Sequence, residues 1–194
     1  MKRVILLFAA IAATMVVASG VALAVTKIGT NGPDVLRGTD HHDRLVGRGG
    51  PDALFGLGAG DCLLGGNGPD SLHGGPGNDT VLGGGADCNA IGRVQERPAA
   101  SDVVRGGRGD DILWGATGAD VISGGRGDDE LGDGEAHRGA LDTLSGGPGD
   151  DFFIPWNSPA GKDLVSCGGG YDEVVADLAD VVSGDCEKVH REDE

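Results

Sequence analysis

The sequence predicts an all-β fold: a right-handed parallel solenoid with two facing sheets of short strands and 18 residues per turn. Aspartate recurs every nine residues at Asp34, Asp43, Asp52, Asp61, Asp70 and Asp79. Glycine is frequent in the five residues before each aspartate, and the second residue after it is apolar, as Leu72 is after Asp70. Neighbouring side chains in a strand point to opposite faces, so each unit is expected to be a six-residue turn and a three-residue strand. Alternate units would stack into the two walls.

The nine-residue spacing is interrupted near residues 83–101, 133–140 and 155–161, which we interpret as insertions. It resumes at Asp102, and again at Asp142 and Asp163. We therefore expect a solenoid over residues 25–166, with roughly nine turns at about 4.8 Å per strand. Residues 167–194 are expected to form a C-terminal capping segment, because the ends of a solenoid need covering.

Residues 1–24 have the composition of a secretory signal peptide. Lys2 and Arg3 precede an apolar run over residues 4–17, and small residues lead to a cleavage site after Ala24. The alternative is an uncleaved membrane anchor, but the run is shorter than the roughly 20 residues of a membrane span. The sequence thus predicts a secreted, extracellular protein with no stable membrane span after cleavage.

The four cysteines form an even set in a chain expected to reach an oxidising compartment, which favours disulfides. Three connectivities are open. Cys167 and Cys186 enclose a compact C-terminal segment and are the preferred pair, which leaves Cys62 with Cys88.

The acidic composition predicts that the chain needs a cation to fold. The sequence has 31 acidic residues, 39 glycines and a net charge of -16. Such a surface repels nucleic acid and anionic lipid, and such a composition stays disordered unless the carboxylates are neutralised. Calcium fits, because it takes six to eight oxygen ligands from carboxylates and carbonyls, and glycine allows a turn to aim its carbonyls at one point.

The units resemble the RTX (hemolysin-type) nonapeptide repeat GGxGxDxUx, as in GGNGPDSLH and GGPGNDTVL from Gly65 to Leu82. The resemblance implies a β-roll that binds multiple Ca²⁺ ions, roughly one per well-formed repeat. RTX rolls are usually attached to an effector domain, whereas only residues 25–28 precede the first unit here. We therefore expect an extracellular structural or binding module, with an accessory or remnant of a secreted RTX hydrolase or toxin as the alternative.

The expected calcium sites lie between stacked turns eighteen residues apart, such as GGRGDD at residues 106–111 and 124–129. The predicted carboxylate ligands are Asp34, Asp52, Asp61, Asp70, Asp79, Asp111, Asp120, Asp129, Asp142, Asp151 and Asp172. The predicted carbonyl ligands are Gly66, Gly68, Gly75, Gly77, Gly107, Gly109, Gly125, Gly127, Gly147 and Gly149. Sites at Asp43 and Asp102 are less well supported, because His41 replaces a turn glycine and no glycine closely precedes Asp102.

No catalytic motif of the HExxH, GxSxG, P-loop or GxGxxG type occurs, so we expect no enzymatic activity. A zinc site at His41 and His42, or a catalytic carboxylate pair at Asp128 and Asp129, is a weaker interpretation than a turn. The aromatic stretch from Phe152 to Trp156, with Trp114, is expected either to be covered by the C-terminal segment or to contact an extracellular protein or glycan.

Overall fold

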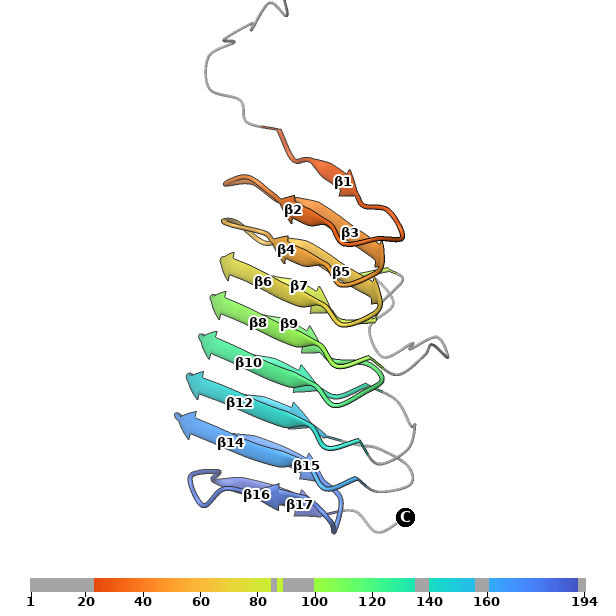
Figure 1. Cartoon of the computed structure of the whole chain (residues 1–194). Coiled ribbons are helices and arrows are strands. Elements are labelled where there is room, and N and C mark those ends of the chain that lie inside the picture. Colours follow the sequence, from red (N-terminus) through yellow and green to blue (C-terminus); the bar gives the residue numbers. More distant parts are fainter. Residues whose placement is uncertain (1–22, 85–86, 89–99, 135–139, 156–160, 192–194) are drawn as a thin grey trace, which may run out of the picture.

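The computed structural model describes residues 23–84, 87–88, 100–134, 140–155 and 161–191. These residues form strands and turns and contain no helix. All strand pairs are parallel, and the strands build two sheets that run side by side along a rod (Figure 1). The predicted all-β parallel solenoid is confirmed, with about eight turns in the part described.

Consecutive strands alternate between the two sheets. The nine-stranded sheet contains β1 (Thr26–Ile28), β3 (Arg44–Gly49), β5 (Cys62–Asn67), β7 (Thr80–Leu82), β9 (Ile112–Trp114), β11 (Glu130–Gly132), β13 (Phe152–Ile154), β15 (Glu173–Ala176) and β17 (Lys188–Arg191). The eight-stranded sheet contains β2 (Val35–Arg37), β4 (Ala53–Phe55), β6 (Ser71–Pro76), β8 (Val103–Arg108), β10 (Val121–Arg126), β12 (Thr143–Pro148), β14 (Leu164–Gly169) and β16 (Val181–Val182).

The register follows the nine-residue units. Leu45 pairs with Leu63 and Leu63 with Val81, so units eighteen residues apart lie side by side. Across the first insertion the pairing joins Leu72 to Val104, and the insertion leaves the register intact. Several strands, such as β8 and β10, have six residues where three were predicted, because they continue into the first half of the following turn.

The core is a single column of apolar residues on each sheet. The second residue after each aspartate is buried along the rod, from Leu45 to Val174. Leu36 and Val182, at the two ends, are only partly buried. The core is thin, so hydrophobic burial is a limited source of stability.

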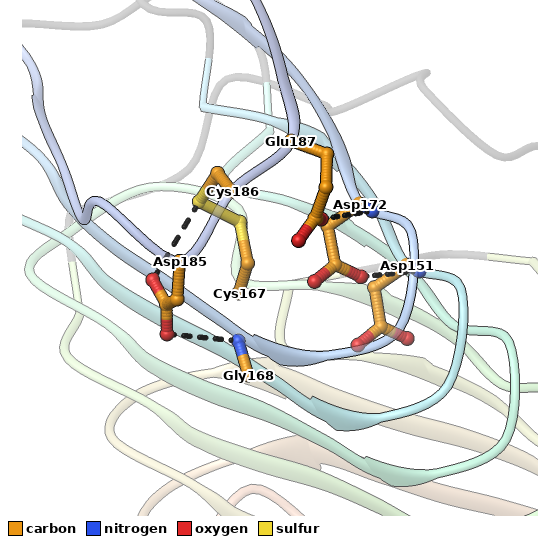
Figure 2. The surroundings of a disulfide bond; sticks show 7 residues. All are labelled: Asp151, Cys167, Gly168, Asp172, Asp185, Cys186 and Glu187. Carbon is orange, nitrogen blue, oxygen red and sulfur yellow. Dashed lines mark hydrogen bonds between the residues drawn. A yellow bond between two sulfur atoms is a disulfide. The ribbon is translucent and has the colours of Figure 1, made fainter.

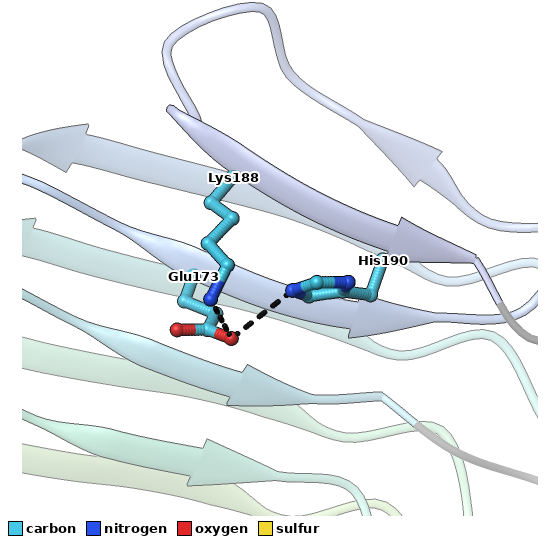
Figure 3. A network of polar contacts seen from close by, with 3 residues as sticks. All are labelled: Glu173, Lys188 and His190. Atoms are coloured by element: carbon cyan, nitrogen blue, oxygen red, sulfur yellow. Dashed lines mark hydrogen bonds and ion pairs between the residues drawn. The ribbon is translucent and has the colours of Figure 1, made fainter.

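The C-terminal segment continues the solenoid. β15 pairs with β13, β17 pairs with β15, and β16 pairs with β14, all in parallel register. Lys188 Nζ and His190 Nε2 lie 2.7 Å and 3.2 Å from Glu173 Oε1, and so tie β17 to β15 (Figure 3). The Lys188 ammonium lowers the pKa of the Glu173 carboxyl.

Both predicted disulfides are present. Cys167 is bonded to Cys186 near the C-terminal end (Figure 2), and Cys62 is bonded to Cys88 at the base of the first insertion. The predicted signal peptide lies almost wholly outside the described residues, as do most residues of the three insertions. Within the described ranges, no helix is long and apolar enough to cross a membrane.

Candidate metal centre

The turns lie along two opposite edges of the roll. We call one the continuous edge: its turns end at Asp43, Asp61, Asp79, Asp111, Asp129, Asp151 and Asp172, and each lies within six residues. We call the other the interrupted edge: its turns end at Asp34, Asp52, Asp70, Asp102, Asp120, Asp142, Asp163 and Asp180, and all three insertions fall there.

The repeat aspartates form a hydrogen-bonded ladder along each edge. The N–H of each aspartate donates to Oδ1 of the aspartate in the next turn, for example Asp111 to Asp129 at 2.9 Å. On the continuous edge the donor–acceptor pairs are Asp43–Asp61, Asp61–Asp79, Asp79–Asp111, Asp111–Asp129, Asp129–Asp151 and Asp151–Asp172. On the interrupted edge they are Asp34–Asp52, Asp52–Asp70, Asp70–Asp102, Asp102–Asp120, Asp120–Asp142, Asp142–Asp163 and Asp163–Asp180. The ladder satisfies Oδ1 of every aspartate in these pairs except the first on each edge, and Asp43 Oδ1 accepts the Val25 N–H at 2.6 Å instead.

The second oxygen of many of these carboxylates is buried without a hydrogen-bond donor. This holds for Oδ2 of Asp52, Asp61, Asp70, Asp79, Asp111, Asp120, Asp129, Asp151 and Asp172. A buried charged oxygen with no partner is costly, and a cation is the partner that a carboxylate in a dry site accepts. All nine are predicted calcium ligands, so the residues present fit that ion.

Backbone carbonyls line the continuous edge in two further columns. The carbonyl oxygen of Gly107 lies 2.1 Å from where a Cβ on Gly125 would be, and that of Gly109 lies 2.1 Å from the same point on Gly127. Gly125 and Gly127 also have positive φ, 127° and 123°. Only glycine therefore allows successive turns to stack this closely. The turns thus supply carbonyl oxygens along the same edge as the carboxylates.

Burial and mutual repulsion raise the pKa of the ladder carboxyls. Desolvation is the largest cause for Asp111, whose pKa rises to about 8, and the charges of Asp79 and Asp129 add to it. Desolvation likewise raises the pKa of Asp102 to about 8, and Asp70 and Asp129 reach about 7. These carboxyls are hard to ionise in the metal-free roll. A divalent cation would stabilise their ionised form most strongly.

Threonine changes the first turn of each edge. Asp34 Oδ2 accepts hydrogen bonds from the Thr30 N–H and hydroxyl at 2.6 Å and 2.9 Å. The same arrangement joins Thr39 to Asp43. The Asp34 carboxylate is thus satisfied within its own turn, and its role as a calcium ligand stays a prediction.

The structure places Asp102 in the ladder, although no glycine closely precedes it. Its Oδ2 lies 2.4 Å from where a Cβ on Gly83 would be, so Gly83 begins the turn that Asp102 ends. The corresponding pair in an uninterrupted turn is Gly106 and Asp111, five residues apart. Gly83 lies outside the six-residue motif that ends at Asp102, so the motif alone does not identify it.

A group of three buried carboxylates at the second insertion was not predicted as a unit. One oxygen from each of Asp133, Asp142 and Asp163 lies within 4.8 Å of the others. Asp133 stands where other turns begin with glycine, and only Asp142 was among the predicted ligands. In the sequence, the feature that pointed to this group was Asp133, an acidic residue at a position where glycine usually begins the turn.

The alternative sites proposed from the sequence have turn geometry. His42 Nδ1 lies 2.5 Å from the Gly60 carbonyl oxygen. Asp129 is buried in the ladder, whereas Asp128 is exposed and accepts the Asp150 N–H at 2.8 Å. The two carboxylates of this doublet therefore serve different hydrogen bonds on different sides of the turn.

The aromatic stretch divides between the core and the surface. Phe153 is fully buried beside Val174 of β15, whereas Phe152 is half-buried on the outer side of β13. The Trp114 ring covers Gly132, whose Cβ would lie 2.4 Å from it. Trp156 is outside the described residues.

Comparison with known families agrees with this geometry. The model of the RTX calcium-binding nonapeptide repeat matches in four copies, over residues 28–54, 55–87, 99–131 and 141–154. No curated protein sequence matches the chain. The four segments cover more than half of the sequence, and the described turns and strands have the repeat's nine-residue period. The chain belongs to the RTX calcium-binding nonapeptide repeat family.

Proposed function

We propose that this protein is a secreted calcium-binding module that folds when its turns fill with Ca²⁺ and then serves as a rigid extracellular structural or binding element without enzymatic activity. The observation that carries the proposal is the set of nine buried Oδ2 atoms without a donor. A cation between stacked turns would satisfy these oxygens and offset the repulsion along the ladder.

The proposed ligands are these nine carboxylates and the carbonyls of the turn glycines predicted above. The ions would be densest on the continuous edge, where Gly75, Gly107, Gly125 and Gly147 stack in successive turns. Removal of residues 1–24, which include Lys2 and Arg3, would change the net charge from -16 to -18. About nine divalent ions would balance that charge, close to one per well-formed turn.

Binding and folding are expected to be coupled, because the thin core offers little stability until the carboxylates are neutralised. Affinities on the order of 10⁻⁴ to 10⁻³ M would make the roll fold at extracellular calcium levels. Far-UV circular dichroism tests this: we expect a disordered spectrum in chelator and a β spectrum after calcium is restored. Magnesium at the same concentration is the control, and an unchanged spectrum in chelator would contradict the proposal.

The proposed secretion depends on the signal-peptide pattern of residues 1–24, and the two disulfides are consistent with it. Mass spectrometry of the exported protein should find a chain that begins at Val25. A protein retained in the cell with reduced cysteines would overturn this part of the proposal.

A further inference from the structure

The outer face of the eight-stranded sheet is unlike the rest of this acidic molecule. Its outward side chains form two rows, one at the first position of each strand and one at the third. The first row is Val35, Ala53, Ser71, Val103, Val121, Thr143, Leu164 and Val181. The second row is Arg37, Phe55, His73, Arg105, Ser123, Ser145, Ser166 and Ser183. None of these described residues is acidic, although the chain has 31 acidic residues.

Six of the eight residues in the first row are apolar, with Ser71 and Thr143 as the exceptions, and four of the six are exposed. Val35 is 67% exposed, Val121 47%, Val181 45% and Leu164 38%. Exposed apolar side chains that gather on one face of a sheet indicate an interaction surface, although Ser71 and Thr143 interrupt the row here. Five strands of six residues and three shorter ones, at about 4.8 Å between strands and about 3.3 Å per residue, give a face of roughly 600 Å².

The second row has two different halves. In the N-terminal half, the Arg37 guanidinium lies 4.4 Å from the Phe55 ring centroid, and Phe55 stacks on His73 at 5.6 Å. Arg105 Nη1 lies 3.3 Å from His73 Nε2. In the C-terminal half, every position of the row is serine. One half is therefore rich in hydrogen-bond donors, and the other offers hydroxyl acceptors.

We propose that this face binds the same face of a second copy of the chain, with the two rods antiparallel. Charge favours this face: the continuous edge carries the exposed Asp110, Asp128 and Asp150, and the outer face of the other sheet carries Glu130 and the Glu173 that Lys188 pairs with. Here two copies can approach without bringing carboxylates together. Two faces of this size would bury roughly 1,200 Å², at the lower end of the range of specific stable interfaces.

The rows match when one rod is reversed about a two-fold axis parallel to the strands. Ala53 of one copy then faces Leu164 of the other, so a small side chain opposes a large one near the ends of the interface. At its centre Val103 faces Val121, and the two side chains have the same size. In the second row, Arg37 faces Ser183 and His73 faces Ser145. Such an isologous interface is closed, because the N-terminal half of each face contacts the C-terminal half of the other and no part of either face is left for a third copy. A parallel arrangement would instead place the arginine rows of the two copies at the same end.

Sedimentation equilibrium in calcium tests the proposal. The wild-type protein is expected to be a dimer, and Val121→Asp a monomer, because the substitution puts a carboxylate against apolar Val103 of the second copy. Ile28→Asp is the matched control: Ile28 is 53% exposed and lies on the outer face of the other sheet, so this variant should stay dimeric. Circular dichroism of each variant verifies that the roll has folded.

Cross-linking tests the orientation. A mixture of Ala53→Cys and Leu164→Cys chains is expected to form a covalent dimer, and neither variant should do so alone. A wild-type monomer, or dimers of unchanged stability with Val121→Asp, would overturn the proposal. Cross-linking of Ala53→Cys with itself would overturn the antiparallel arrangement.

Discussion

The two edges of the roll carry the same aspartate ladder but differ in their turns. The continuous edge repeats six-residue, glycine-rich turns from Gly56 to Asp172, whereas the interrupted edge admits insertions of up to a dozen or more residues. Asp102 still receives the Asp70 N–H across the largest insertion. The ladder therefore requires only an aspartate in register, whereas we expect a calcium turn to require glycine at fixed positions as well. On this proposal, backbone order and capacity for calcium are separable properties of the repeat.

The largest expected effect is a pH dependence that both edges share when metal is absent. The pKa is about 8 in the folded roll for Asp102 on one edge and Asp111 on the other, against 3.8 as the ordinary value. The folded state therefore binds more protons between these values, so its stability is full below about pH 4 and is lost as pH rises to about 8.

Far-UV circular dichroism of metal-free protein at pH 5 and pH 8 should show more β structure at pH 5, because the ladder carboxyls are then largely protonated. Calcium affinity should follow the opposite order, because binding requires ionised carboxylates. A metal-free roll that is more stable at pH 8 would show that the ladder carboxyls are not destabilised by burial.

Gly125→Ala on the continuous edge is expected to have the next largest effect. A Cβ would lie 2.1 Å from the Gly107 carbonyl oxygen, at a φ of 127°. The strained backbone alone costs roughly 1–3 kcal/mol, and calcium-saturated melting should show a large loss. Gly169→Ala is the matched control on the same edge, because nothing lies within 4 Å of its Cβ position. Equal melting temperatures for the two variants would contradict the close stacking of turns.

A pair of asparagine variants separates the ladder from the ion sites. Asn keeps the Oδ1 acceptor and removes the charge, so Asp129→Asn should raise the calcium concentration at the folding midpoint about tenfold. Asp102→Asn should not raise it, because the turn that Asp102 ends has no compact glycine motif. Calcium titrations followed by circular dichroism measure both, and equal shifts would show that the edges bind calcium alike.

The smallest expected effect on stability comes from the removal of one insertion. Deletion of residues 86–99 leaves GGGASD at residues 83–102, a six-residue turn, and Cys62→Ser removes the cysteine left without a partner. Loop closure changes slowly with loop length, so stability should change by less than about 1 kcal/mol relative to a full-length control that also lacks the Cys62–Cys88 disulfide. Equilibrium dialysis should find additional bound calcium relative to a full-length control with both Cys62→Ser and Cys88→Ser. Unchanged stoichiometry would mean that compact turns alone do not create sites.

The fold could be predicted from the sequence because the nine-residue period determines which residues lie side by side. Asp70 and Leu72 occupy fixed places in the unit, and a turn of two units brings Leu72 beside Leu54 as predicted. The disulfide between Cys62 and Cys88 could be predicted only because these two cysteines remained after Cys167 was paired with Cys186. Its placement at the base of the first insertion depends on strand pairing, which the spacing of cysteines does not encode.

The details of the site were less predictable, because they depend on contacts across insertions or within a single turn. Gly83 completes the turn of Asp102 from beyond an insertion, which a local motif cannot show. Thr30 satisfies Asp34 through its hydroxyl and N–H, which a glycine in its place would do only in part. Asp133 joins Asp142 and Asp163 because Asp133 begins the turn that Asp142 ends, and β12 and β14, which follow Asp142 and Asp163, pair in one sheet.

The direction of the ladder makes the two ends of the rod inequivalent. Each aspartate N–H depends on a carboxylate supplied by the following turn, and the last acceptor on the continuous edge is Glu187, which receives the Asp172 N–H at 2.8 Å (Figure 2). At the N-terminal end the ladder finishes in carboxylate oxygens, and at the C-terminal end it finishes in an N–H donor. Glu187 accepts that last N–H from within its own turn, so the ladder on the continuous edge ends there without a further aspartate repeat.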